Sequence, residues 1–156
     1  MTRDAAAGLS QELRVLYARL AAAAASASDD LSLTTTQRMA LFELTGEPLR
    51  LGELAARVAV SDPTASRAVE GLVTAGLAAR VPDPDDRRAV RIGATAAGRA
   101  YVEARTAAVE GELRVALERL DGDEAATLLR LLARLNAGLR DGGHPGTAAA
   151  LLLGGR

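Results

Sequence analysis

Apolar residues recur at spacings of three and four along much of the chain, as they do on the buried face of an α-helix. The pattern predicts one helix over residues 9–27 and two long helices near the C-terminal end, the first beginning at Thr95. The second begins at Asp121, which forms a capping-box pattern with Glu124. Alanine, leucine and arginine are frequent and aromatic residues are few, so the sequence predicts a mainly helical fold.

Three shorter helices are predicted in the middle of the chain. Thr34 and Gln37 form another capping box at the start of the first, which ends at residues 46–48, Gly-Glu-Pro. After a short extended piece at residues 49–51, Gly52 opens the second. The short helices and the hairpin that follows them predict a compact unit between the flanking long helices.

The third short helix is the first candidate for function. Ser61 is its predicted N-cap, Pro63 lies in its first turn and Gly76 ends it. The N–H groups at such a helix start have no partner within the helix and can bind a phosphate.

The two faces of this helix differ. With residues placed 100° apart, Ala65, Val69 and Leu72 fall within one arc and are expected to face the core. Arg67 lies nearly opposite, with Gly71 beside it. This outer face would let the helix backbone lie deep in a major groove while Arg67 reaches a guanine edge or a phosphate.

A β-hairpin is predicted after the third short helix. Residues 79–81 and 90–92 alternate apolar and basic side chains, and residues 82–88 form the turn, which two prolines stiffen. A stiff loop with arginines at its far end can enter a minor groove, where narrow A·T tracts concentrate negative potential. We expect Asp86 to hold Arg88 in position through an ion pair.

Composition narrows the function classes further. The net charge of −1, from 19 basic and 20 acidic residues, excludes histone-like binding but leaves room for a locally basic face. The chain has no cysteine, and its single histidine, His144, lies in a predicted loose tail, so we expect no cofactor, no metal site and no catalytic residues. The longest run of small apolar residues, 20–25, is too short to span a bilayer, and no signal-peptide core follows the polar N-terminus. We therefore expect a cytoplasmic protein.

Two functions remain open on these grounds. Two helices joined by a tight turn and followed by a hairpin with an arginine-bearing tip form the outline of a winged helix-turn-helix, which favours binding of double-stranded DNA. However, residues 61–92 contain five arginines and five acidic residues, so the region is neutral overall. The alternative is a winged-helix protein-interaction module without DNA binding.

Two stretches of the chain resemble a known family. Residues 54–77, LAARVAVSDPTASRAVEGLVTAGL, are similar to the helix-turn-helix of the MarR-type (multiple antibiotic resistance regulator) repressors. Residues 83–99, DPDDRRAVRIGATAAGR, are similar to the wing of these repressors and the helix that follows it. The resemblance covers about residues 9–140.

The resemblance implies a winged helix-turn-helix flanked by N- and C-terminal dimerisation helices, in a homodimer of triangular shape. Residues 1–30 and 95–140 would form the dimerisation region, residues 31–94 the DNA-binding lobe, and residues 141–156 a C-terminal tail. Such a dimer would present two equivalent helices to a near-palindromic operator. The expected function is a sequence-specific transcriptional regulator, most simply a repressor released by a small aromatic or phenolic ligand.

The resemblance also implies site residues. Those expected to face the major groove are Ser61, Pro63, Thr64, Ser66 and Arg67. Asp86 and Arg88 match the Asp-x-Arg of the family's wing, and Arg87 lies between them at the same tip. For the ligand, which family members often bind between the dimer helices and the DNA-binding lobe, the candidates are Tyr17, Arg38 and Phe42. The alternative is that each of these three is an ordinary core or surface residue.

Overall fold

A computed structural model of the chain describes residues 2–27, 32–86 and 88–141. It is mainly helical with one small antiparallel hairpin, as the sequence predicts. The elements, in chain order, are α1 (Thr2–Ser26), α2 (Thr35–Leu44), α3 (Leu51–Val58), α4 (Asp62–Thr74), β1 (Ala78–Pro82), β2 (Val90–Ala94), α5 (Ala96–Leu117) and α6 (Gly122–Asp141). The predicted order of elements is confirmed, although α1 begins seven residues earlier than its apolar pattern indicates.

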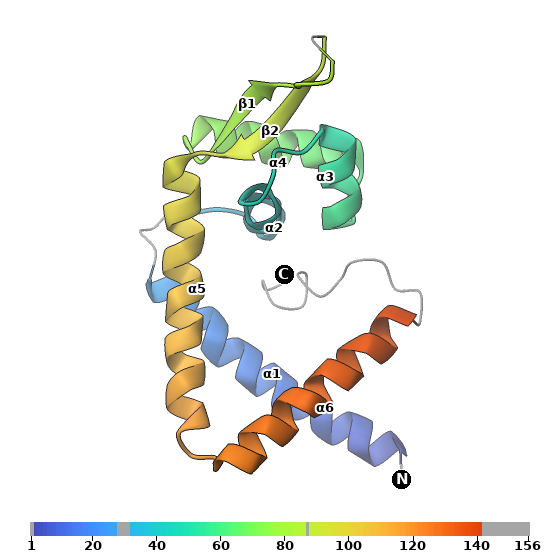
Figure 1. Cartoon of the computed structure of the whole chain (residues 1–156), viewed down its shortest axis with the longest axis vertical. Helices are drawn as coiled ribbons and strands as arrows, with labels where there is room; N and C mark the ends of the chain where they lie inside the picture. The colour runs from blue at the N-terminus through green and yellow to red at the C-terminus, as the bar shows by residue number, and fades with distance from the viewer. Residues whose placement is uncertain (1, 28–31, 87, 142–156) are drawn as a thin grey trace.

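The elements form a lobe and a helical frame (Figure 1). The lobe contains α2, α3, α4 and the hairpin, and α5 runs from it toward the other end of the molecule, where α6 begins. α1 packs along α5, and Arg105 of α5 donates a hydrogen bond of 2.9 Å to the carbonyl of Ala24 near the end of α1. α6 packs closely against no other element of the described chain.

The structure confirms the two predicted capping boxes, at the starts of α2 and α6. The hydroxyl of Thr34 accepts from the backbone N–H of Gln37 at 3.2 Å, and the Gln37 side chain accepts from the N–H of Thr34 at 2.7 Å. Asp121 and Glu124 make the same reciprocal pair of hydrogen bonds at the start of α6. These bonds satisfy N–H groups that have no partner within the helix, which is why each helix begins where it does.

The core of the lobe is apolar and continuous. Its fully buried large side chains come from the three helices α2, α3 and α4: Leu41, Leu44, Leu54, Val69 and Leu72. The hairpin joins this core through β2, where Leu49 forms an isolated β-bridge with Ile92, the middle residue of the strand, through hydrogen bonds of 2.9 and 2.8 Å. The second strand of the wing is therefore fastened to the segment that precedes α3.

The strand register departs from simple alternation. Arg80 pairs with Ile92, and Val81 pairs with Arg91, so the apolar positions of the two strands do not share one face. Ile92 is buried, whereas Val90, near the tip, is exposed. The hairpin projects beyond the core toward its tip, so alternation along each strand does not decide burial there.

The turn between α3 and α4 works without a glycine. Ala59 takes the left-handed conformation, with φ of 57°, and the N–H of Val60 bonds the carbonyl of Ala55 at 3.0 Å. This hydrogen bond closes the end of α3 and turns the chain into α4.

No helix among the described residues is long and apolar enough to cross a membrane.

Candidate nucleic-acid interface

α4 has one buried and one exposed face, as its sequence predicts. Ala65, Val69 and Leu72 are buried in the core, together with Ala68. On the other side, Arg67 is exposed. Ser61 and Pro63, at the start of the helix, are also exposed, and Thr64 and Ser66 are half-buried. The predicted outward-facing set therefore lies along one edge and the start of α4.

Several polar contacts shape the exposed surface of α4, and in one of them the hydroxyl of Ser66 donates to the carboxylate of the exposed Glu70 at 3.3 Å. The Nε of Arg67 donates to the carbonyl of Pro63 at 3.3 Å, which draws the side chain back toward the helix start. The hydroxyl of Ser61 lies 2.9 Å from that of Thr64 and caps no backbone N–H, although Ser61 stands at the predicted N-cap position. The start of α4 thus places the cationic side chain of Arg67 near the first turn of the helix, which also carries the acidic Asp62. Pro63 has no N–H and the N–H of Thr64 bonds the carbonyl of Ser61 at 2.9 Å, so a phosphate contact here depends on Arg67 rather than on free N–H groups of the helix.

Gly71 does not belong to this outer face. A Cβ added there would lie 2.0 Å from the Nε2 of Gln37, so Gly71 faces α2. The helical wheel placed Gly71 beside Arg67, and this expectation is wrong. The reason is that the capping side chain of Gln37 on α2 lies against α4 at Gly71.

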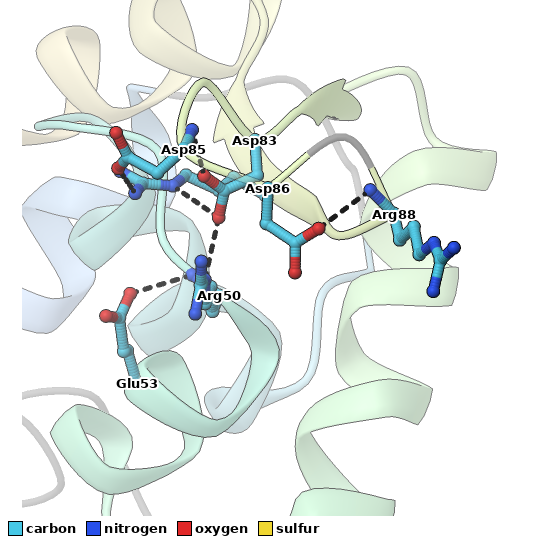
Figure 2. Close-up of polar contacts among 7 residues, drawn as sticks. Arg50, Glu53, Asp83, Asp85, Asp86 and Arg88 are labelled. Atoms are coloured by element: carbon cyan, nitrogen blue, oxygen red, sulfur yellow. Dashed lines mark hydrogen bonds and ion pairs between the residues drawn. The ribbon is translucent and has the colours of Figure 1, made fainter.

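The wing tip is held by a backbone contact. Asp86 accepts the backbone N–H of Arg88 at 2.9 Å, and the carbonyl of Asp86 accepts the N–H of Ala89 at 2.9 Å. In Figure 2 the guanidinium of Arg88 points away from Asp86. The predicted ion pair between these two side chains is therefore replaced by a turn that leaves the Arg88 side chain directed outward. Arg87 lies outside the described residues.

An ion-pair cluster that sequence reasoning missed lies behind the tip. The Asp83 carboxylate, whose side chain has no exposed area, accepts from the Nε of Arg50 at 2.7 Å. The Nε of Arg91 lies 3.0 Å from the same oxygen, as an ion pair rather than an aligned hydrogen bond. The Nη2 of Arg91 also contacts Asp85 at 3.0 Å. Figure 2 shows how Arg50 and the wing loop converge here.

This cluster perturbs its central carboxyl group. The hydrogen bond from Arg50 holds the pKa of Asp83 well below its usual range, with smaller contributions from Arg91 and from the backbone N–H of Asp85. These contacts favour the charged form and outweigh the opposing effect of burial. The available sequence signal was an aspartate directly after a strand, but its partner Arg50 lies 33 residues away, so no local pattern pairs the two.

The three ligand candidates, Tyr17, Arg38 and Phe42, do not line one common cavity in the described part of the structure. Among the described residues, a cavity of about 520 Å³ lies between α2 and α5, and of the three candidates only Phe42 lines it. Arg38 instead donates to the carbonyl of Leu33 and the hydroxyl of Thr35, so it braces the start of α2. Tyr17 is half-buried on α1 and does not line this cavity.

The cavity between α2 and α5 mixes apolar and charged groups. The side chain of Phe42 is exposed at its α2 side, and Val102 and Ala107 add apolar surface from α5. Arg99 and Glu103 supply opposite charges, and the complete lining also includes Thr45, Thr106 and Glu110. Its volume falls within the usual range for small-molecule pockets.

Comparisons with known proteins agree with this geometry. The model of the MarR family matches residues 31–89, which include α2, α3, α4 and β1 and end before β2. A comparison with curated protein sequences gives no match. The structure is similar to that of a probable transcriptional regulator from Pseudomonas aeruginosa, at 38% sequence identity and a TM-score of 0.56. That match covers 81% of this chain and 95% of the other.

Further solved structures share the fold over most of their length. The RV1404 protein of Mycobacterium tuberculosis is 29% identical, with a TM-score of 0.74 and coverage of 93% of this chain and 97% of that one. Staphylococcus aureus MepR, solved with ethidium bromide bound, is 22% identical with a TM-score of 0.65, covering 83% and 95% of the two chains. With its capped helix-turn-helix, its wing and these relatives, the chain belongs to the MarR family of DNA-binding winged-helix transcriptional regulators.

Proposed function

We propose that this chain is a homodimeric repressor that binds a near-palindromic operator through α4 and the wing and is released by a small aromatic molecule. The exposed edge of α4 is the observation that carries the proposal. It is backed by a fully buried apolar face, and it presents Arg67 and the polar residues at the helix start to solvent. A helix held rigidly by its core, with polar side chains on its outer side, can lie in a major groove.

The wing supplies the second contact in this proposal. Arg88 extends from a turn that Asp86 fixes through the backbone, so its guanidinium is free of that carboxylate. Arginines inserted into narrow minor grooves bind through the negative potential there. Together, α4 and the wing would contact adjacent grooves from residues 31–94.

Dimerisation is supported by apolar surface that one copy leaves uncovered. α1 exposes Leu9, Leu13 and Leu16, and α6 exposes further leucines. The exposed large apolar residues of α6 are Leu128, Leu129, Leu131 and Leu135. An apolar surface of this extent marks an association site. We assign it to a second copy, with residues 1–30 and 95–140 forming the dimerisation region.

The effector site in this proposal is the cavity between α2 and α5. It lies between the DNA-binding lobe and the helix that connects the lobe to the dimerisation region, so a bound molecule would change the angle between them. An aromatic molecule can stack on the exposed ring of Phe42. That a related protein, MepR, is solved with ethidium bromide supports the choice of an aromatic ligand.

Because the proposed partner of this chain is DNA, we place its action in the cytoplasm.

Binding to DNA tests the proposal directly. The full chain is titrated with duplexes selected from random sequence by the protein itself, at several salt concentrations. We expect tight binding to a selected sequence, weakening steeply with salt because phosphate contacts release counterions. Arg88→Ala should weaken binding without changing thermal stability or dimerisation. If the selection yields no preferred sequence, sequence-specific binding is contradicted, and if the chain then binds no duplex at all, the protein-interaction module is favoured. If Arg88→Ala binds like the parent, the wing assignment is wrong.

The effector site has its own test. Aromatic compounds, including ethidium, are screened for release of the selected duplex, and the response is measured again in Phe42→Ala and Tyr17→Ala. We expect Phe42→Ala to lose the response because it removes the ring that lines the cavity, and Tyr17→Ala to keep it. The opposite order of effects would place the ligand against α1.

A further inference from the structure

The Arg50–Asp83–Arg91 cluster joins two parts of the lobe that are distant in sequence. Asp83 directly follows β1, at the root of the wing loop. One of its oxygens receives Arg50 and Arg91, and the other accepts the backbone N–H of Asp85 at 2.9 Å. Both oxygens of this buried carboxylate are therefore engaged, one by the wing loop itself and the other by two guanidinium groups.

Arg50 connects the cluster to the helix-turn-helix. It is the N-cap residue of α3, and its backbone N–H is held by Glu53 of that helix at 2.9 Å. α3 in turn packs against α4. The root of the wing loop is thus tied, through one side chain, to the helix that supports the proposed recognition helix.

The hairpin needs such a tie. A two-stranded hairpin is at most marginally stable by itself, and here the β-bridge between Leu49 and Ile92 fastens β2 only at its middle residue. The cluster lies beyond this bridge, nearer the tip that carries Arg88. The cluster therefore holds the wing loop where it leaves β1, and this contact can fix the direction in which the loop extends.

We propose that Arg50 and Asp83 are positioning residues for DNA binding, which aim the wing so that Arg88 reaches the duplex while α4 occupies its groove. The inference rests on the proposed function. It assigns no DNA contact to Asp83, whose side chain is buried. Asp83 would affect DNA binding only through the position of the wing.

The direction in which Asp83→Asn changes DNA affinity separates a positioning role from a simple charge effect. Asp83→Asn removes a negative charge from the lobe, and a loss of negative charge near DNA by itself strengthens binding. If Asp83 aims the wing, the same change weakens binding. Glu47→Gln is the matched control, because Glu47 is an exposed acidic residue on the segment that leads to Arg50.

The experiment measures dissociation constants by fluorescence anisotropy, using the duplex selected by the wild-type chain. We expect Asp83→Asn to weaken binding by roughly 3- to 30-fold and Glu47→Gln to leave it unchanged or strengthen it. We also expect Arg88→Ala to have little further effect in the Asp83→Asn background, because the wing is already misdirected. Binding by Asp83→Asn that equals or exceeds the wild type, or full additivity with Arg88→Ala, would overturn the inference.

A second variant keeps the test decisive if Asp83→Asn does not fold, as judged by circular dichroism and sedimentation. Arg50→Gln leaves Asp83 paired with Arg91 and is combined with Arg88→Ala in the same way. Sub-additive losses support positioning, whereas additive losses identify Arg50 as an independent phosphate contact and overturn it. Failure of the wild-type chain to select any duplex would instead defeat the proposed function.

Discussion

Arg67 and Arg88 are the two described arginines that we place at the DNA, and a different contact orients each of them. Arg67 is drawn along α4 by the carbonyl of Pro63, and Arg88 is set by the turn at Asp86. Neither contact neutralises the guanidinium, so both side chains keep their charge for a phosphate or a base edge. We expect local positive charge at these two sites to matter more for binding than the net charge of −1 of the whole chain.

Arg67→Ala tests base reading at the residue scale. If Arg67 binds a guanine edge, the substitution should reduce operator affinity by roughly 1–3 kcal/mol and relax the preference at one base pair. Binding of the variant to the selected duplex and to a duplex of random sequence is compared with that of the parent. An equal loss on both duplexes would show that Arg67 contacts only a phosphate.

Asp83 predicts a dependence of stability on pH. The pKa of Asp83 is lower in the folded chain than in the unfolded chain, where an aspartate titrates at about 3.9. Its charge therefore stabilises the fold above that pH, and this contribution is lost as the pH falls through the folded pKa. We expect Asp83→Asn to unfold more easily than the parent at pH 7 and the difference to shrink below about pH 4.

Urea unfolding at fixed protein concentration measures this difference at pH 7 and at pH 2.5, well below the pKa of an aspartate in the unfolded chain. Fixed concentration matters because unfolding of a dimer depends on it. Glu47→Gln, which removes an exposed carboxylate, should change the free energy of unfolding little at either pH. A difference between Asp83→Asn and the parent that stays constant with pH would contradict the ionised, paired state of Asp83.

At the scale of elements, the junction between α4 and α5 depends on a close approach. The hydroxyl of Thr95 donates to the carbonyl of Gly76 at 2.7 Å and accepts the N–H of Gly98 at 3.1 Å. A Cβ added at Gly98 would lie 2.0 Å from the carbonyl oxygen of Leu77. The first turn of α5 is therefore seated on the turn that follows α4, and only a glycine fits there.

Gly98→Ala should lower the free energy of unfolding by roughly 1–3 kcal/mol, since the added methyl group must displace backbone. Gly52→Ala is the matched control in the first turn of α3, where an added Cβ meets nothing within 4 Å. That control should leave stability unchanged or raise it by up to about 1 kcal/mol. Equal effects of the two substitutions in thermal unfolding would show that the α4–α5 junction is looser than described.

The elements that could be predicted from the sequence are those defined by short-range signals. The capping pairs Thr34–Gln37 and Asp121–Glu124 span three residues each, and the structure confirms both. The buried face of α4 follows from its periodicity. The partner of Asp83 could not be predicted, because the contact depends on how the wing folds back onto α3.

The same limit explains the two incorrect details of the candidate site. A helical wheel places Gly71 by angle alone, but the close packing of α4 against α2 decides what the residue faces. Asp86 and Arg88 suggested an ion pair by charge, whereas a turn brings the backbone N–H within reach first. The ligand candidates depended on the family resemblance, and only Phe42 lies at the cavity between α2 and α5.

At the scale of the whole molecule, the lobe and the helical frame differ in how completely they bury apolar surface. The lobe encloses its core, whereas α1 and α6 leave rows of leucines exposed. The frame is therefore incomplete in one copy, and a second copy is what we expect to cover it. A two-fold dimer then presents two copies of α4 to half-sites about one helical turn apart.

Footprinting of the full chain on its selected duplex tests this account most directly. Hydroxyl-radical cleavage should show two equivalent protected blocks related by two-fold symmetry, with centres about 10–10.5 base pairs apart or a multiple of that spacing. The blocks should include both a major groove and the neighbouring minor groove, as α4 and the wing require. A single unsymmetrical block, or protection that is the same on any sequence, would contradict a dimer that reads its operator through α4.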